Sequence, residues 1–119
     1  MSTEQYDAIV VGSGQGGTPL SRALAEAGMH TALVEREHVG GTCVNEGCTP
    51  TKTMIASAQV AYYARNAARW GVRAENVSLD LPAVIARKDS VVQIFRGGQQ
   101  RRVDKRPNLH LYRGHARRQ

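Results

Sequence analysis

Cys43 and Cys48 are the two cysteines of this 119-residue chain, and they lie five positions apart. A close pair in a chain with few cysteines is more often catalytic, redox-active or metal-binding than structural. On a regular helix this spacing would leave the two side chains roughly 140° apart. A disulfide needs Cα atoms within about 7 Å and converging Cβ atoms. We therefore expect the segment between them to be partly non-helical, because Asn45 and Gly47 tolerate turns.

The residues after Cys48 predict a helix start, since Thr49-Pro50 suits a first helical turn. The positive end of that helix would lie near Cys48 and favour a thiolate there. A strained, exposed pair with a lowered thiol pKa is typical of a reducible disulfide. Lys52 follows Cys48 by about one helical turn, so its ammonium could lie beside whatever Cys48 touches, or it could simply be solvated.

Two other interpretations of the cysteine pair stay open from the residues alone. The thiols could be unrelated and buried, or they could bind zinc. A structural zinc site needs four nitrogen or sulfur ligands. The histidines that could complete one have no familiar spacing from the cysteines: His30, His38, His110 and His115. We therefore favour the redox interpretation and expect no metal at the pair.

A glycine-rich turn, Gly12-Ser-Gly-Gln-Gly-Gly17, precedes the cysteines and indicates a dinucleotide site. Gly12 permits a tight turn, Gly14 lets the backbone approach a pyrophosphate, and Gly17 lets helix and strand pack closely. Helix N–H groups then point at the anion. Glu35 follows Gly12 by 23 residues and can accept hydrogen bonds from both ribose hydroxyls, which favours FAD or NAD over NADP. The alternative is a glycine-rich turn with no ligand.

The elements around this turn predict a βαβ unit. Residues 6–11 form an apolar run typical of a central parallel strand covered on both faces. Residues 18–28 predict a helix that ends at Gly28, a residue suited to a left-handed cap. Residues 31–35 predict a second strand. The apolar face expected on the helix is Leu20, Ala23, Leu24 and Ala27.

Two further helices and a short strand are expected after the cysteines. The first helix runs from residue 49 to 69 or 70 and stops at Gly71; its expected stripe is Ile55, Ala58, Tyr62 and Arg65. Asp80 caps the second helix, with Pro82 in its first turn, an interruption at Gly97-Gly98 and an end at Pro107. Its expected apolar face is Leu81, Val84, Ile85, Val91, Val92 and Phe95. Residues 108–113 alternate like an edge strand.

The composition is that of an ordinary globular protein, with 41% hydrophobic residues and a net charge of +6. Residues 96–119 hold eight Lys or Arg and one acid. Such a run can bind nucleic acid, but no aromatic interleaving or known module accompanies it, so we expect no nucleic-acid partner. No apolar run is long enough for a membrane span, and residues 1–6 lack the features of a secretory signal. We expect a cytoplasmic location.

The stretch GGTCVNEGCTPTK, residues 40–52, resembles the active-site signature of the class I pyridine nucleotide–disulfide oxidoreductases. This family includes the lipoamide dehydrogenase, glutathione reductase and mercuric reductase relatives. The motifs VVGSGQGG and LVERE strengthen the resemblance, which covers essentially the whole chain. Residues 51–72 look most like the mercuric-reductase-like branch. Glu46 and Thr49 depart from the apolar residues often found there, and Glu46 should oppose a Cys48 thiolate unless it points to solvent.

The resemblance implies an FAD-dependent enzyme with NAD(P)H as co-substrate. Cys43 would be the thiol that meets the substrate, and Cys48 would lie against the flavin as the charge-transfer thiolate. Lys52 would lie near the reactive edge of the flavin. The substrate would be a small-molecule disulfide or Hg(II). The other residues that it assigns to FAD binding are Gly12, Gly14, Gly16, Gly17, Glu35, Gly41 and Thr42.

The resemblance also implies a longer protein, because family members add an NAD(P) domain and a dimerisation domain and act as homodimers. We therefore expect residues 1–119 to be the N-terminal portion of an α/β, Rossmann-like FAD-binding domain, incomplete and with its parallel sheet open and apolar. Alone, the chain should bind FAD weakly and turn over poorly. The competing functions are a non-catalytic FAD-binding or thiol redox-carrier module, and a basic interaction protein.

Overall fold

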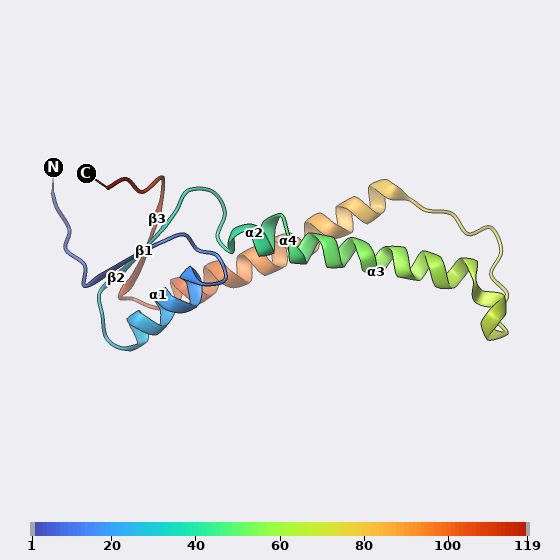
Figure 1. Ribbon diagram of the computed structural model, residues 1–119, viewed down its shortest axis with the longest axis horizontal. Coiled ribbons are helices and arrows are strands. Elements are labelled where there is room, and N and C mark those ends of the chain that lie inside the picture. The colour runs from blue at the N-terminus through green and yellow to red at the C-terminus, as the bar shows by residue number, and fades with distance from the viewer. Residues whose placement is uncertain (1, 119) are drawn as a thin grey trace.

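The computed structural model describes residues 2–118, so Met1 and Gln119, the ends of the predicted 1–119 span, lie outside the described residues. Three strands and several helices alternate along the chain (Figure 1). None of the helices in the described part is both long and apolar enough to cross a membrane. The elements are β1 (Ala8–Val11), α1 (Gly17–Glu26), β2 (Thr31–Glu35), α2 (Gly41–Asn45), α3 (Cys48–Arg65), the 3₁₀ helix η1 (Ala67–Trp70), α4 (Leu81–Asp104) and β3 (Leu109–Arg113).

The described chain is elongated, with extents of 67 × 26 × 19 Å. The sheet and α1 lie at one end, and α3 and α4 extend from it as an antiparallel pair (Figure 1). Helix α4 then returns to the sheet, where its last turns join the core. Helix α2 and the start of α3, which carry Cys43 and Cys48, lie between the sheet and the extended pair (Figure 1).

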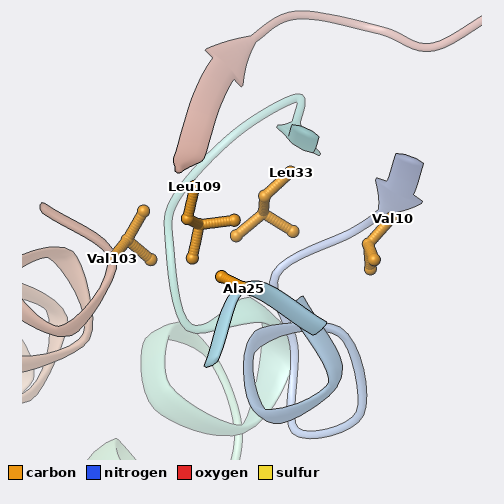
Figure 2. Packing of buried hydrophobic residues seen from close by; sticks show 5 residues of the cluster. All are labelled: Val10, Ala25, Leu33, Val103 and Leu109. Carbon is orange, nitrogen blue, oxygen red and sulfur yellow. The ribbon is translucent and has the colours of Figure 1, made fainter. Parts of the chain in front are cut away.

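The sheet is wholly parallel in the order β1-β2-β3, which confirms the expected α/β fold. One face packs on α1 and the end of α4, with a small core that is shown in Figure 2: Val10, Ala25, Leu33, Val103 and Leu109. The prediction that the first strand is central and covered on both faces is wrong. It begins at Ala8, lies at an edge, and leaves Ile9 and Val11 65% and 67% exposed. The expected open, apolar sheet face is therefore present.

The face predicted for helix α1 is only partly correct, because Leu24 is half-buried against the core but the other three residues are exposed. Its buried residues are Thr18, Ser21 and Ala25, whereas Leu20 is 52% exposed. Ala23 and Ala27 are exposed as well. The approach of the helix to β1 is closest at Gly17, where a Cβ would lie 1.7 Å from the Gly12 carbonyl oxygen, and the buried residues that follow are small. The expected cap is correct, since Gly28 has φ +89° and its N–H donates to the Ala25 carbonyl.

Helix α3 ends at Arg65, earlier than the predicted residue 69 or 70. The Asn66 side chain donates to the Tyr62 carbonyl at 2.8 Å, and the chain tightens into η1. Gly71 stops it with φ +70°, as predicted. The predicted stripe does not pack: Ile55 and Tyr62 are exposed, as are Ala58 and Arg65. The buried position is Thr53, whose carbonyl accepts a hydrogen bond from Arg87 of α4 at 3.0 Å.

Helix α4 is capped as predicted, since the Asp80 carboxylate accepts a hydrogen bond from the Ala83 N–H at 3.0 Å. The predicted interruption at Gly97-Gly98 is wrong, because α4 is continuous to Asp104. Val92 and Val103 are buried in the helical turns before and after the two glycines. Because extending an existing helix costs less than starting a new one, the residues between them stay helical. The predicted apolar face is only partly correct: Val92 is buried and Val84 and Val91 are half-buried, but the other three are exposed, namely Leu81, Ile85 and Phe95.

Candidate nucleotide and dithiol site

The glycine turn connects β1 to α1 at the carboxyl end of the sheet. Gly12 has φ +92° and donates its N–H to the Val34 carbonyl of β2 at 2.7 Å. A Cβ on Gly17 would lie 1.7 Å from the Gly12 carbonyl oxygen, so only glycine allows this approach of helix to strand. Helix α1 has no side-chain cap and no acid in its first turn. The Thr18 N–H already donates to the Gly14 carbonyl at 3.1 Å and Pro19 has no N–H, so the Gly17 N–H is the group of this first turn that can point at an anion.

Glu35 ends β2 with a buried carboxylate, 7% exposed. One carboxylate oxygen accepts hydrogen bonds from the Ser13 N–H at 2.9 Å and the Ser13 hydroxyl at 2.5 Å. The other accepts from the Glu37 N–H at 2.9 Å. Burial raises the pKa of Glu35, but the hydrogen bonds from Ser13 and from backbone N–H groups outweigh burial and leave the pKa below its ordinary value. The carboxylate is thus ionised and fixed in direction.

A cavity of about 280 Å³ lies where the glycine turn, the end of β2 and α2 meet. Five of the predicted cofactor residues line it together: Gly12, Gly14, Glu35, Gly41 and Thr42. Gly16 and Gly17 do not line it and lie at the start of α1 behind it. Backbone N–H groups, a glycine floor and a carboxylate at the strand end fit the diphosphate and ribose of a dinucleotide.

Gly40 and Gly41 join this cavity to the cysteine segment. Gly40 donates its N–H to the Ser13 carbonyl at 3.1 Å and has φ +103°. Gly41 has φ +64°, and a Cβ there would lie 2.6 Å from the Gly14 Cα. Gly41 is needed because α2 begins against the glycine turn, and Gly40 is needed because a Cβ there would lie 2.8 Å from the Val44 Cβ.

The cysteines lie on two separate helices, so the segment between them is partly non-helical, as expected for a pair that can form a disulfide. Helix α2 carries Cys43 and ends at Asn45, and α3 begins at Cys48. Gly47 connects them with φ −118° and ψ −111°, and a Cβ there would lie 3.3 Å from the Cys43 Cα. Both are free thiols, with Cys43 half-buried and Cys48 exposed. Hydrogen bonding with the Cys48 thiol and burial raise the pKa of Cys43, against the opposing charge of Lys52.

Lys52 does not line the nucleotide cavity. It lines a second cavity of about 480 Å³ between α3 and α4, together with Cys48, Thr49, Thr53, Ala56, Arg87, Val91 and Phe95. The thiol of Cys48 and the ammonium of Lys52 therefore face one space. Glu46 lines the nucleotide cavity instead. Its side chain is exposed to solvent, which is the arrangement expected if its negative charge is not to oppose a Cys48 thiolate.

Two residues that support this site were not found from the sequence. Ser13 fixes Glu35, and the Asn45 amide donates to the Val39 and Gly41 carbonyls at 3.1 and 2.9 Å. The Asn45 carbonyl oxygen accepts from Arg96 of α4 at 2.6 Å. Asn45 carried only a turn signal, and nothing in the sequence connected it to a residue 51 positions later.

The zinc alternative finds no support at the cysteines. Within residues 2–118, the side chains close enough to share a metal ion are Glu4, His30 and His110, and neither cysteine is among them. These residues lie near the amino ends of the strands, away from the dithiol.

A parallel βαβ unit with a glycine turn, an acid at the second strand end and an adjoining dithiol is a dinucleotide-binding α/β fold of the oxidoreductase kind. Residues 6–112 match the family described as pyridine nucleotide-disulphide oxidoreductase. The chain belongs to this family of enzymes.

Individual relatives agree with the family. The chain is 43% identical over 95 residues to a dihydrolipoyl dehydrogenase of Chlamydia trachomatis, covering 80% of this chain and 20% of the relative. It is 41% identical over 92 residues to a mercuric reductase of Streptomyces lividans, covering 76% and 19%. The solved HOCl-induced flavoprotein disulfide reductase RclA from Escherichia coli matches with a TM-score of 0.78 and 32% identity, over 95% of this chain and 22% of that one. The chain thus spans about a fifth of the length of these relatives.

Proposed function

We propose that residues 1–119 are the N-terminal portion of the FAD-binding domain of an FAD-dependent NAD(P)H:disulfide or metal-ion oxidoreductase. The observation that carries this proposal is the dithiol of Cys43 on α2 and Cys48 at the start of α3, beside a cavity suited to a dinucleotide. Bound FAD would supply electrons from NAD(P)H to the Cys43–Cys48 disulfide. Because the chain spans about a fifth of its relatives, the activity is proposed for a protein of family length.

The roles proposed for the chain's own residues follow from where they lie. Glu35 would accept hydrogen bonds from the adenosine ribose, and the start of α1 would bind the pyrophosphate, with Gly12, Gly14, Gly16 and Gly17 allowing its close approach. Gly41 and Thr42 would lie along the FAD. The disulfide takes up two electrons and two protons to give two thiols. Cys43 would then attack the substrate. Cys48 and Lys52 line the second cavity together, so both would lie at the flavin if its ring occupied that cavity.

The substrate we propose is a small-molecule disulfide or Hg(II), with the mercuric-reductase-like assignment supported by residues 51–72 and by the Streptomyces lividans relative. A second solved structure of RclA is a Cu(II) complex, so a metal ion bound to a structural relative has precedent. We also propose a cytoplasmic location, where a reducing environment suits a catalytic pair, and a homodimer at full length, with no nucleic-acid or membrane partner.

Alkylation tests the roles of the two cysteines. In the reduced chain without FAD, iodoacetamide should modify Cys48 faster, because it is exposed whereas Cys43 is half-buried with a raised pKa. Adding FAD should slow modification of Cys48 and leave Cys43 less affected, as mass spectrometry of the digested chain would measure. FAD that binds without protecting Cys48 would contradict the proposed position of that thiol.

Replacing Cys43 separates the enzyme from the competing redox-carrier module. In a protein of family length, Cys43→Ser should abolish substrate reduction while FAD stays bound and reducible by NAD(P)H. Glu75→Gln, a change at an exposed side chain outside both cavities, should leave turnover within about twofold. Turnover that survives in Cys43→Ser would exclude the dithiol mechanism.

A further inference from the structure

A second group of ligating side chains lies at the opposite end of the strands from the nucleotide cavity. His30 directly precedes β2, and His110 is the second residue of β3. Glu4 comes from the segment before β1. One ring nitrogen of each histidine and one oxygen of Glu4 lie within 4.8 Å of one another. Three segments far apart in the sequence thus place two imidazoles and a carboxylate together.

The hydrogen bonds of the two imidazoles determine which nitrogen is free. His30 Nδ1 lies 3.0 Å from the Gln5 carbonyl oxygen, and His110 Nε2 lies 3.1 Å from the Pro107 carbonyl oxygen. A carbonyl oxygen can only accept, so each of these nitrogens carries the proton of the neutral ring. His30 Nε2 and His110 Nδ1 therefore keep their lone pairs. Metal-binding histidines commonly donate their other N–H to a backbone carbonyl in this way.

Aromatic packing holds the two rings in place. The Tyr6 ring stacks on His30 with centroids 4.3 Å apart, and the His30 and His110 rings meet edge to face at 4.9 Å. Glu4 is exposed, and one of its carboxylate oxygens accepts a hydrogen bond from the Tyr112 hydroxyl at 2.7 Å. The Glu4 carboxylate already lies 3.7 Å from His110 Nδ1. Ligands at ~2.1 Å from a tetrahedral ion lie about 3.4 Å apart, so only a small closure is required.

We propose that Glu4, His30 and His110 bind one divalent transition-metal ion of the zinc and copper class. Imidazole favours these ions over Mg²⁺ or Ca²⁺, which prefer all-oxygen sites. The Tyr6 hydroxyl lies 2.9 Å from His110 Nδ1, and the metal ion replaces this hydrogen bond when it binds that nitrogen. Tyr6 then keeps its hydrogen bond to the Tyr112 hydroxyl. Three protein ligands leave the fourth position to water. The ion fastens the segment before β1 to β3, and the site is separate from the dithiol.

Zinc titration of a cysteine-free chain tests the site. The background Cys43→Ser/Cys48→Ser removes the competing thiols, and the protein carries no affinity tag. Calorimetry should show one Zn²⁺ per chain, and His30→Gln or His110→Gln should weaken binding at least tenfold. His38→Gln and His115→Gln change histidines outside the cluster and should leave binding unchanged. Equal binding by the His30→Gln and His110→Gln variants, or no saturable binding by the parent, would overturn the proposal.

A spectroscopic measurement covers the case in which a histidine variant fails to fold. Electron paramagnetic resonance of Cu²⁺ added at one equivalent to the cysteine-free parent should show coupling to two nitrogen atoms. The melting temperature of this parent, followed by circular dichroism, should rise with Zn²⁺, and the rise should vanish in His30→Gln and persist in His115→Gln. Coupling to no nitrogen, or an equal rise in His30→Gln, would overturn the site.

Discussion

At the scale of single residues, Glu35 shows how one carboxylate serves structure and a candidate function together. A buried carboxylate is costly unless its lone pairs are satisfied. Ser13 supplies two donors and the Glu37 backbone a third, so the charge is stabilised where β2 ends. The oxygen that accepts from the Glu37 N–H has room for one further hydrogen bond, so this arrangement is compatible with one ribose hydroxyl.

Replacing Glu35 should therefore weaken the fold in a pH-dependent way. Glu35→Gln puts an uncharged amide opposite the hydrogen-bond donors of Ser13 and the Glu37 backbone. This change should lower the free energy of unfolding by about 1.5 to 3 kcal/mol near pH 7. The pKa of Glu35 lies below its ordinary 4.5 in the folded chain, so its stabilisation is complete above that pH and is lost as the pH falls through the lowered pKa.

Urea unfolding at several pH values between about 3 and 7 measures this effect. The stability difference between the parent and Glu35→Gln should shrink as the pH drops below 4.5. Glu37→Gln, on the exposed neighbour, should change stability by less than about 0.5 kcal/mol at every pH. A difference that stays constant with pH would contradict the assigned role of the Glu35 charge.

At the scale of elements, glycine has opposite effects in α1 and α4. Gly17 begins α1 against the Gly12 carbonyl, and no other residue fits. Gly97 and Gly98 lie inside α4, and a Cβ at either would meet nothing but the flexible Arg101 side chain, at 3.3 and 3.9 Å. Gly17 is therefore required, because the neighbouring backbone leaves no room for a side chain. Gly97 and Gly98 are not required, because the packing around α4 leaves room for a Cβ at both.

Gly17→Ala should destabilise the chain by at least about 3 kcal/mol, because the new Cβ must displace backbone. Gly16→Ala is the matched control, since a Cβ at Gly16 has open space. Its cost should stay below about 1 kcal/mol. Denaturant unfolding of both variants gives the comparison, and equal stability of the two would show that the close packing of α1 on β1 is wrong.

Gly97→Ala/Gly98→Ala should stabilise the chain by about 1 to 2 kcal/mol in total, because alanine restricts the unfolded chain and favours helix. Thermal unfolding followed by circular dichroism would record a higher melting temperature with no loss of helix signal. A lower melting temperature would indicate that α4 needs flexibility at these positions.

At the scale of the whole molecule, the sheet is covered on one face. The described chain has a radius of gyration of 20.4 Å, whereas a compact chain of this length would have about 13.5 Å. A parallel sheet is normally buried on both faces. Ile9 and Val11 instead present apolar side chains on the open face of β1. The 119-residue chain should accordingly expose apolar surface in solution.

The open face should bind an apolar dye. Ile9→Thr/Val11→Thr should lower the fluorescence of anilinonaphthalene sulfonate and reduce self-association in analytical ultracentrifugation, because threonine keeps the β-branched shape and adds a hydroxyl. Ile94→Thr is the matched control, since Ile94 is 67% exposed but lies on α4. An equal decrease in the control would show that the sheet face is not the binding surface.

The sequence by itself determined the local order of this protein. The alternation of apolar runs and glycines predicted the parallel βαβ unit, and the cap residues Asp80, Gly28 and Gly71 marked helix ends, because capping and strand propensity depend on near neighbours. The five-position spacing of the cysteines predicted, for a pair that can form a disulfide, the break found between α2 and α3. These features follow from backbone geometry over a few residues.

Only the tertiary structure decided which faces are buried and which distant side chains meet. Leu20 and Ile55 carry a helical apolar pattern yet lie exposed, because close packing at Gly17 selects small side chains and α3 extends beyond the sheet. Arg96 reaches Asn45, and His110 lies beside Glu4, through contacts between segments far apart in the sequence. Such contacts depend on how whole elements pack, which no local pattern of residues encodes.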